Sequence, residues 1–181
     1  AVTDGVSSAR VRNVGDALNG EYYIKITADN HSDYVTASKV KVEVRKATLT
    51  VSVNIGIYYG ENSPLDYDGS GNVFEATIAA LRTEGGIYSI DAADFKGDDR
   101  ALFYGDAAFY GLDKNATSTM SYAFGDKAYV KGDGIGAYTL MFVKGDLACE
   151  NYEFAAAAGA LTVSALPVSI VVNNGDNLSA V

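Results

Sequence analysis

The chain has 181 residues with 48% hydrophobic side chains, so it is long and apolar enough to bury an ordinary core. Its 13 tyrosines and 19 glycines, together with the absence of tryptophan, favour strands and turns over helices. The formal net charge of −9 repels phosphate backbones and anionic lipids, and no apolar run is long enough for a membrane-spanning helix, so neither nucleic acid nor direct membrane insertion is expected.

The first clear strand pattern lies in residues 40–44, where three valines alternate with charged side chains. It predicts a half-buried strand with one face in water. A second alternation, in residues 49–53, is shifted by one position, and such a shift sends the apolar side chains to the other face of the strand. We therefore predict a junction between two modules at Lys46 and Ala47, through which the strand continues without a flexible linker.

The same shift of phase recurs near the C-terminus, across residues 164–167. Two such junctions divide the chain into three parts. Residues 1–46 are predicted to be the C-terminal part of a preceding β-module, residues 47–165 a complete module, and residues 166–181 the first strand of a following module.

An internal repeat supports this division. Three pairs of segments match at offsets of 116, 118 and 119 residues, namely 20–26 with 136–142, 33–34 with 151–152, and 51–54 with 170–173. A period near 118 residues is long enough for one β-domain per repeat, so the pattern predicts tandem modules.

Dense turn signals cut residues 47–165 into short segments, as an antiparallel all-β domain requires. Residues 73–82 fit either a strand or one short helix, because their apolar positions agree with both periods. The sequence thus predicts an all-β fold of tandem modules with at most one short helix. Ig-like β-sandwich and grasp-like arrangements both fit the run of short strands.

Five short motifs of the module belong together: 46–53 (Lys-Ala-Thr-Leu-Thr-Val-Ser-Val), 59–65 (Tyr-Gly-Glu-Asn-Ser-Pro-Leu), 136–138 (Gly-Ala-Tyr), 151–152 (Asn-Tyr) and 159–163 (Gly-Ala-Leu-Thr-Val). With a closing Ala165, this set resembles the MBG domain family of the YGX type, whose members occur in tandem in large bacterial surface and adhesin-like proteins. The resemblance covers residues 47–166 and leaves an insertion around residues 88–135. It implies an extracellular, β-rich spacer or adhesive module on the bacterial cell surface, with neighbouring modules of the same protein as partners.

The sequence offers no constellation of catalytic residues. Its one histidine, His31, lies in an Asn-His-Ser-Asp turn, where adjacent residues cannot supply the geometry of a hydrolytic triad. The 23 acidic residues allow many carboxylate pairs and single out none as glycosidase groups. A single cysteine, Cys149, excludes an internal disulfide and a cysteine metal cluster. We therefore expect a protein that is not an enzyme, with no catalytic residues.

One acidic turn resembles the beginning of a calcium-binding loop. Asp66, Asp68 and Ser70 supply oxygen ligands at positions 1, 3 and 5, and a glycine follows at position 6. Position 12 carries Thr77 instead of a bidentate glutamate, so a turn rich in aspartate and glycine is the favoured interpretation. Calcium bound by these three residues is the secondary hypothesis, and no other cofactor is expected.

The richest aromatic stretch, residues 103–129, falls inside the insertion. Exposed tyrosines there would stack on sugar rings or pack on a partner protein, and Tyr104, Tyr110 and Tyr122 are the candidate ligand-binding residues. The favoured alternative is that these rings build the core of the added strands.

These features give three hypotheses about function. The leading one is a non-enzymatic structural or adhesive repeat that extends a stalk and presents the insertion to a host or matrix glycan or protein. The second is a carbohydrate-binding module that uses the aromatic insertion. The third is a filament subunit, in which neighbouring chains complete each other by strand addition.

Overall fold

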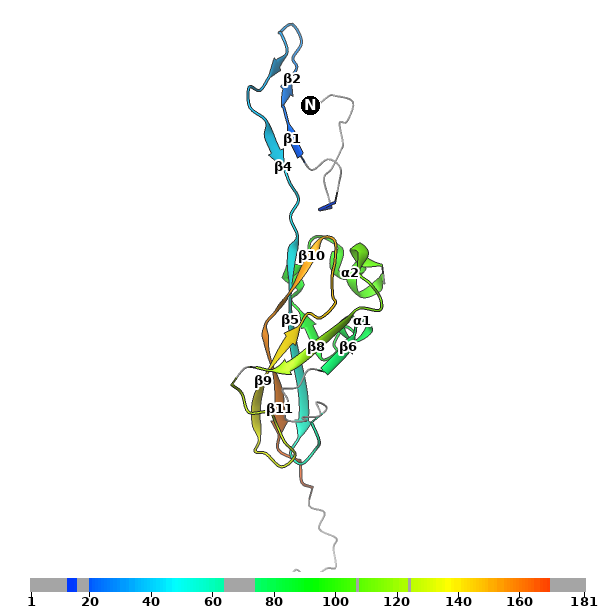
Figure 1. The fold of residues 1–181 in the computed structure, drawn as a ribbon, viewed down its shortest axis with the longest axis vertical. Coiled ribbons are helices and arrows are strands. Elements are labelled where there is room, and N and C mark those ends of the chain that lie inside the picture. The colour runs from blue at the N-terminus through cyan, green and yellow to red at the C-terminus, as the bar shows by residue number, and fades with distance from the viewer. Residues whose placement is uncertain (1–12, 16–19, 64–73, 107, 124, 170–181) are drawn as a thin grey trace, which may run out of the picture.

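The computed structural model describes residues 13–15, 20–63, 74–106, 108–123 and 125–169 (Figure 1). Strands predominate in this part of the chain, and the predicted all-β class is confirmed. Among the described residues, α2 (Asp99–Gly105) is the one helix of seven or more residues. None of the described helices is long and apolar enough to cross a membrane.

Seven strands form the main sheet of the module. In order across the sheet they are β10 (Tyr152–Ala156), β5 (Ala47–Tyr58), β11 (Ala158–Ser164), β9 (Gly136–Val143), β8 (Thr117–Tyr122) and β6 (Phe74–Thr77), with β7 (Tyr88–Ile90) also paired to β5. β10 and β11 run parallel to β5, whereas the other pairs are antiparallel. The long strand β5 therefore has both strands of the C-terminal segment as neighbours.

β10 and β11 follow β5 in succession, with a bulge between them. Tyr152 pairs with Ala47, an offset of 105 residues, whereas Ala160 pairs with Asn54, an offset of 106. The C-terminal side thus contains one extra residue, which defines a β-bulge. The Asn54 side chain stabilises the shifted register, since its Oδ1 accepts a hydrogen bond of 3.2 Å from the Ala160 N–H.

The apolar alternation at the start of β5 gives the module its core. Leu49, Val51 and Val53 are fully buried, while Thr48 and Asn54 are exposed. Burying each of these three aliphatic side chains contributes about 1.5–3 kcal/mol. The buried core residues of the described chain all fall between Leu49 and Val163, so the core belongs to the part of the chain that starts with β5.

The segment 73–82, whose apolar pattern fits a strand or a helix, contains one of each. β6 ends at Thr77 and α1 (Ile78–Leu81) follows directly, with Ile78 and Leu81 buried against the sheet. Arg82 then donates hydrogen bonds to the carbonyl oxygens of Phe103 and Asp106, which satisfies acceptors at the C-terminal end of α2. Two short 3-10 turns flank α2, η1 (Ala92–Asp94) and η2 (Phe109–Gly111).

A hairpin with two arms extends from the end of the module where β5 begins (Figure 1). One arm contains β1 (Gly20–Tyr22) and β2 (Lys25–Ile26), and the returning arm contains β3 (Tyr34–Val35) and β4 (Val40–Val42). β1 pairs with β4 and β2 with β3, both antiparallel. Such a ribbon has too little apolar contact to form a core of its own.

Two expectations for this region are wrong. Val40 and Val42 are exposed at 43% and 36%, so β4 is not half-buried, because the described hairpin packs no other layer on its apolar face. The strand also does not continue through the junction, since β4 ends at Val42 and β5 begins at Ala47. The described pairing of β4 stops where Val42 meets Gly20, which leaves residues 43–46 without a described strand to pair with.

The close approach of β11 to β5 requires glycine at position 159. A Cβ at this position would lie 1.9 Å from the Val53 carbonyl oxygen, so Gly159→Ala must push β11 away from β5. We expect the substitution to lower the free energy of unfolding by about 1–3 kcal/mol in urea denaturation, as overpacking does. Gly56→Ala in the same strand pair is the control, because a Cβ there meets nothing within 4 Å. Equal stability of the two variants would contradict the close approach.

Candidate functional site at the junction

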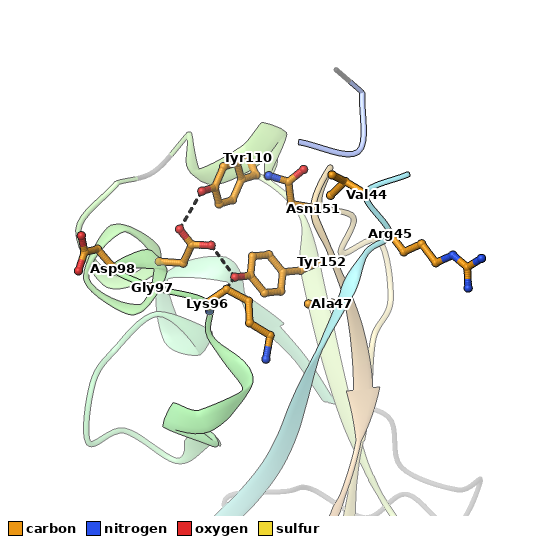
Figure 2. Close-up of a pocket in the computed structure, with 10 residues that line it drawn as sticks. Val44, Arg45, Ala47, Lys96, Gly97, Asp98, Tyr110, Asn151 and Tyr152 are labelled. Atoms are coloured by element: carbon orange, nitrogen blue, oxygen red, sulfur yellow. Dashed lines mark hydrogen bonds between the residues drawn. The ribbon is translucent and has the colours of Figure 1, made fainter. Parts of the chain in front are cut away.

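A cavity of about 330 Å³ lies where β5 begins, between the junction and the loop that leads into α2 (Figure 2). Val44, Arg45 and Ala47 form one wall, and residues 96–99 form the opposite wall. Tyr152 lies between the two walls, because its position at the start of β10 places it opposite Ala47 in the sheet. The cavity thus joins the frame of the module to its insertion.

Asp99 is the central polar group of this site. It is the first residue of α2, where a carboxylate interacts favourably with the helix dipole, and it is only 7% exposed. Its two carboxylate oxygens accept hydrogen bonds from two phenols, that of Tyr110 at 2.7 Å and that of Tyr152 at 2.5 Å (Figure 2). A buried carboxyl group requires such partners, and the two phenols provide a donor to each of its oxygens.

The electrostatics of the site keep its protons in place. Burial, followed by the hydrogen bond to Asp99, raises the pKa of the Tyr152 hydroxyl well above its ordinary value. Tyr152 therefore remains a donor to Asp99 at neutral pH, and its oxygen also accepts a bond of 3.1 Å from the Lys96 N–H. Burial likewise raises the pKa of the nearby Cys149 thiol, which keeps it neutral and poorly nucleophilic.

Aromatic rings of the insertion surround Tyr152. The Phe109 ring stacks on Tyr152 with centroids 5.7 Å apart, and Phe103 meets Phe109 edge-on at 5.4 Å. Phe95 completes the group at 5.4 Å from Phe103 and 6.3 Å from Tyr152. We call Phe95, Phe103, Phe109 and Tyr152 the aromatic cluster. All four rings are buried, so these aromatic residues build core between the insertion and the frame.

Asn151 fastens the junction from the other side of the site. Its backbone carbonyl accepts a 3.0 Å hydrogen bond from the Ala47 N–H at the first residue of β5. Its side-chain Oδ1 accepts a 3.0 Å bond from the Val14 N–H, and its Nδ2 donates to Asn13 Oδ1 at 2.8 Å. Lys46 adds a fourth link, because its Nζ donates to the Cys149 carbonyl oxygen at 2.7 Å. Asn151 is 8% exposed, so its side-chain bonds are partly shielded from water.

The three tyrosines predicted to bind a ligand do not form one platform. Tyr110 lines the junction cavity and is bonded to Asp99, whereas Tyr104 lines a separate, open hollow of about 550 Å³. The Arg100 guanidinium lies 5.6 Å from the centre of the Tyr104 ring. Tyr122 lies on β8, with its hydroxyl 3.4 Å from Ser63 Oγ. All three side chains are partly buried against the core, and their role in binding stays a prediction.

The other predicted residues lie away from this site. His31 is exposed in the turn of the hairpin between β2 and β3. Asp66, Asp68 and Ser70, the predicted calcium ligands, fall outside the described residues. Within the described ranges, no group of three or more His, Cys, Asp or Glu side chains is placed to hold a metal ion.

Sequence reasoning missed the two residues that organise the site, Asp99 and Asn151. Asp99 stands in a Lys-Gly-Asp-Asp-Arg run that has the composition of an exposed turn, and no periodicity marks it as buried. Asn151 belongs to the internal repeat, and its match to Asp33 carries no sign of its bonds to segment 13–15. Both residues act through contacts distant in sequence, for which local patterns carry no signal.

Hydrogen bonds hold the polar side chains of the cavity in place, and we call Asp99 with its two donors, Tyr110 and Tyr152, the clamp. Asp99 accepts hydrogen bonds from the two phenols, and the described lining residues include no imidazole or thiol. Two basic residues, Arg45 and Lys96, and two acidic residues, Asp98 and Asp99, line the cavity, and the Arg45 side chain points away from it towards Glu43 (Figure 2). The lining therefore carries no excess of positive charge. Comparisons of the chain with protein-family models, with curated proteins and with solved structures give no match.

Removing one phenol tests the clamp. Tyr152→Phe deletes a donor to a buried carboxylate, so we expect the free energy of unfolding to fall by about 1–3 kcal/mol at pH 7. Tyr58→Phe, on an exposed tyrosine of β5, is the control and should change stability little. A similar loss from both substitutions would contradict the clamp.

The clamp also predicts a dependence on pH. Because the pKa of Tyr152 is raised in the folded protein, its stabilising contribution is complete below the unfolded value of about 10 and is lost as the pH rises above it. The stability difference between wild type and Tyr152→Phe should therefore be constant from pH 7 to 9 and should shrink above pH 10. Denaturation curves at several alkaline pH values measure this, and a difference that grows above pH 10 would reverse the sign we assign.

Proposed function

We propose that the chain is a non-enzymatic structural or adhesive repeat of a bacterial surface protein, acting outside the cell. The proposal draws on the resemblance of residues 47–166 to the MBG domain family and on the internal repeat. In this role the module adds length to a stalk, fixes the orientation of the next module and presents its insertion at the side. Neighbouring modules of the same protein are its first partners.

The observation that supports this function best is the set of hydrogen bonds at the junction between the hairpin and the module. Four hydrogen bonds converge within a few residues, and they involve Lys46, Ala47, Asn151 and segment 13–15. A flexible tether between modules would be rich in glycine or serine and would make few contacts. A short connection with partly buried hydrogen bonds instead restricts the angle between the hairpin and the module.

The direction of the strands supports the same role. β5 and β11 are parallel, so the chain enters the module at one end and leaves it at the other (Figure 1). The hairpin lies at the entry end and residues 165–169 at the exit end. Repeats joined in this way stack end to end, which is the geometry of a spacer.

Solution scattering on the Asn151→Ala variant tests the stiffness. We expect the substitution to remove the bonds to Asn13 and Val14, so the distribution of interatomic distances should broaden while the far-ultraviolet circular dichroism stays that of the wild type. Asn115→Ala, on an exposed loop, is the control and should leave the scattering unchanged. If wild type already scatters as a freely jointed pair of bodies, the proposed rigid spacer is wrong.

A second candidate function, carbohydrate binding, is favoured by one observation. Tyr104 lines the open hollow together with Glu84 and Arg100, and these two charged residues form an ion pair beside the ring. An aromatic ring beside charged hydrogen-bonding groups is a combination suited to binding a sugar.

A glycan array distinguishes this candidate from the spacer. If the hollow binds sugars, Tyr104→Ala should abolish the signal, whereas Tyr122→Ala should keep it, because Tyr122 does not line the hollow. Thermal denaturation of both variants controls for folding. Absence of binding by the wild type across the array would remove the candidate and leave the spacer untouched.

A further inference from the structure

Asn151 is bonded to both ends of one segment of the chain. Its side chain accepts a 3.0 Å hydrogen bond from the Val14 N–H and donates one of 2.8 Å to Asn13 Oδ1. Its backbone carbonyl accepts a 3.0 Å bond from the Ala47 N–H. Residues 15–46, which include the whole hairpin, lie between these two anchor points in the sequence. Tension that arrives along the chain at Asn13 and Val14 is therefore passed by Asn151 directly to the module, and the hairpin carries none of it while these bonds hold.

The hairpin is held together by few interactions. Three residue pairs join β1 to β4 and two join β2 to β3. Its large apolar side chains are exposed, among them Tyr23 at 55% and Ile26 at 57%, so the arms bury little surface against each other. The ion pairs between the arms are about half exposed and add little to its stability. An isolated hairpin of this kind is at best marginally stable in water.

Tension would load the hairpin in its weakest direction. Gly20 and Val42 lie opposite each other at the base of the hairpin, on the side of the module (Figure 1). A force that separates these two residues pulls the arms apart sideways. It acts on one residue pair at a time, from this base pair to the pair of Ile26 and Tyr34 near the turn.

The module is loaded in the opposite way. The chain enters it at Ala47, the first residue of β5, and leaves it at Ser164, the last residue of the parallel strand β11. A force between these two residues acts along both strands, so the hydrogen bonds of their five consecutive residue pairs are loaded together. The buried side chains of β5 also have to leave the core before the strands slide. The module therefore withstands a force at which the hairpin separates.

We infer that the hairpin stores chain length, which tension releases while the module stays folded. The bonds from Asn151 to residues 13–14 break first, the two arms separate, and residues 15–46 extend by about 110 Å. A hairpin re-forms in about 1–10 μs, so the length is taken up again when the tension falls. The inference rests on the proposed spacer function, because a stalk carries tension, but it concerns the response to load and not the stiffness at rest.

Force spectroscopy on single molecules of the full chain, pulled through its two ends, tests the inference. We expect two events in a fixed order. The first adds about 110 Å of contour length at the lower force, and the second, from residues 47–164, is about three times as long. A single event that unfolds hairpin and module together would overturn the inference, as would a module that unfolds before the first extension.

A reversible crosslink shows whether the first extension comes from the hairpin. Gly20→Cys combined with Val42→Cys places two thiols on opposite residues of an antiparallel pair, at a separation that a disulfide spans. A Cβ at position 20 meets only the Tyr22 side chain, at 3.8 Å or more, and the native Cys149 is buried. In the oxidised protein the extension reached before the module unfolds should be shorter by about 70 Å, and reduction should restore it. An extension that oxidation leaves unchanged would overturn the inference.

The part played by Asn151 is tested with Asn151→Ala. Because this variant lacks the side-chain bonds to Asn13 and Val14, its first extension should begin at a lower force than in the wild type. Asn115→Ala, on an exposed loop, is the matched control and should extend as the wild type does. An unchanged force in Asn151→Ala would mean that Asn151 does not close the segment. Scattering from the unloaded chain measures the stiffness of the spacer separately, so the failure of either proposal is recognised independently of the other.

Discussion

The structure depends on the parallel pairing of β5 with the strands β10 and β11. This pairing joins residues more than 100 positions apart, so the chain closes a long loop before the contact forms, and the loss of entropy must be offset by what the contact buries. Leu49, Val51 and Val53 provide that burial, because β5 places all three in the core. The residues between β5 and β10, including the insertion, form a loop whose two ends are joined by this pairing.

The bulge at the centre of that pairing lets two registers coexist. Before it, β10 aligns Tyr152 with the entry of β5, and after it β11 aligns with the exit end of the same strand. Two residues maintain the shift. Gly159 lets the backbone of β11 approach the Val53 carbonyl group of β5, and the Asn54 side chain accepts a hydrogen bond from the Ala160 N–H. Because β5 and β11 are parallel, tension between the two ends of the module acts along the strands and is shared by all their hydrogen bonds at once.

Sequence reasoning reached the fold class and the core strand, and physical reasons limit the rest. The alternation at residues 49–53 depends only on the period of a strand, so it identified the buried side chains of β5 correctly. The aromatic stretch in the insertion was expected to be core, and Phe103, Phe109 and Tyr129 are buried. Asp99 could not be found in this way, because its burial depends on two phenols that reach it from other parts of the chain.

The hairpin shows why pattern and burial are different properties. Residues 20–26 and 136–142 share their alternation, yet Ile24 is 42% exposed while Leu140 is fully buried. An amphipathic strand specifies which face can be buried, and a partner strand determines whether it is. In the module β5 fills that role and completes the core. The hairpin and the module thus share one alternation of side chains, and among the described residues only the module has a strand of the β5 type that buries it.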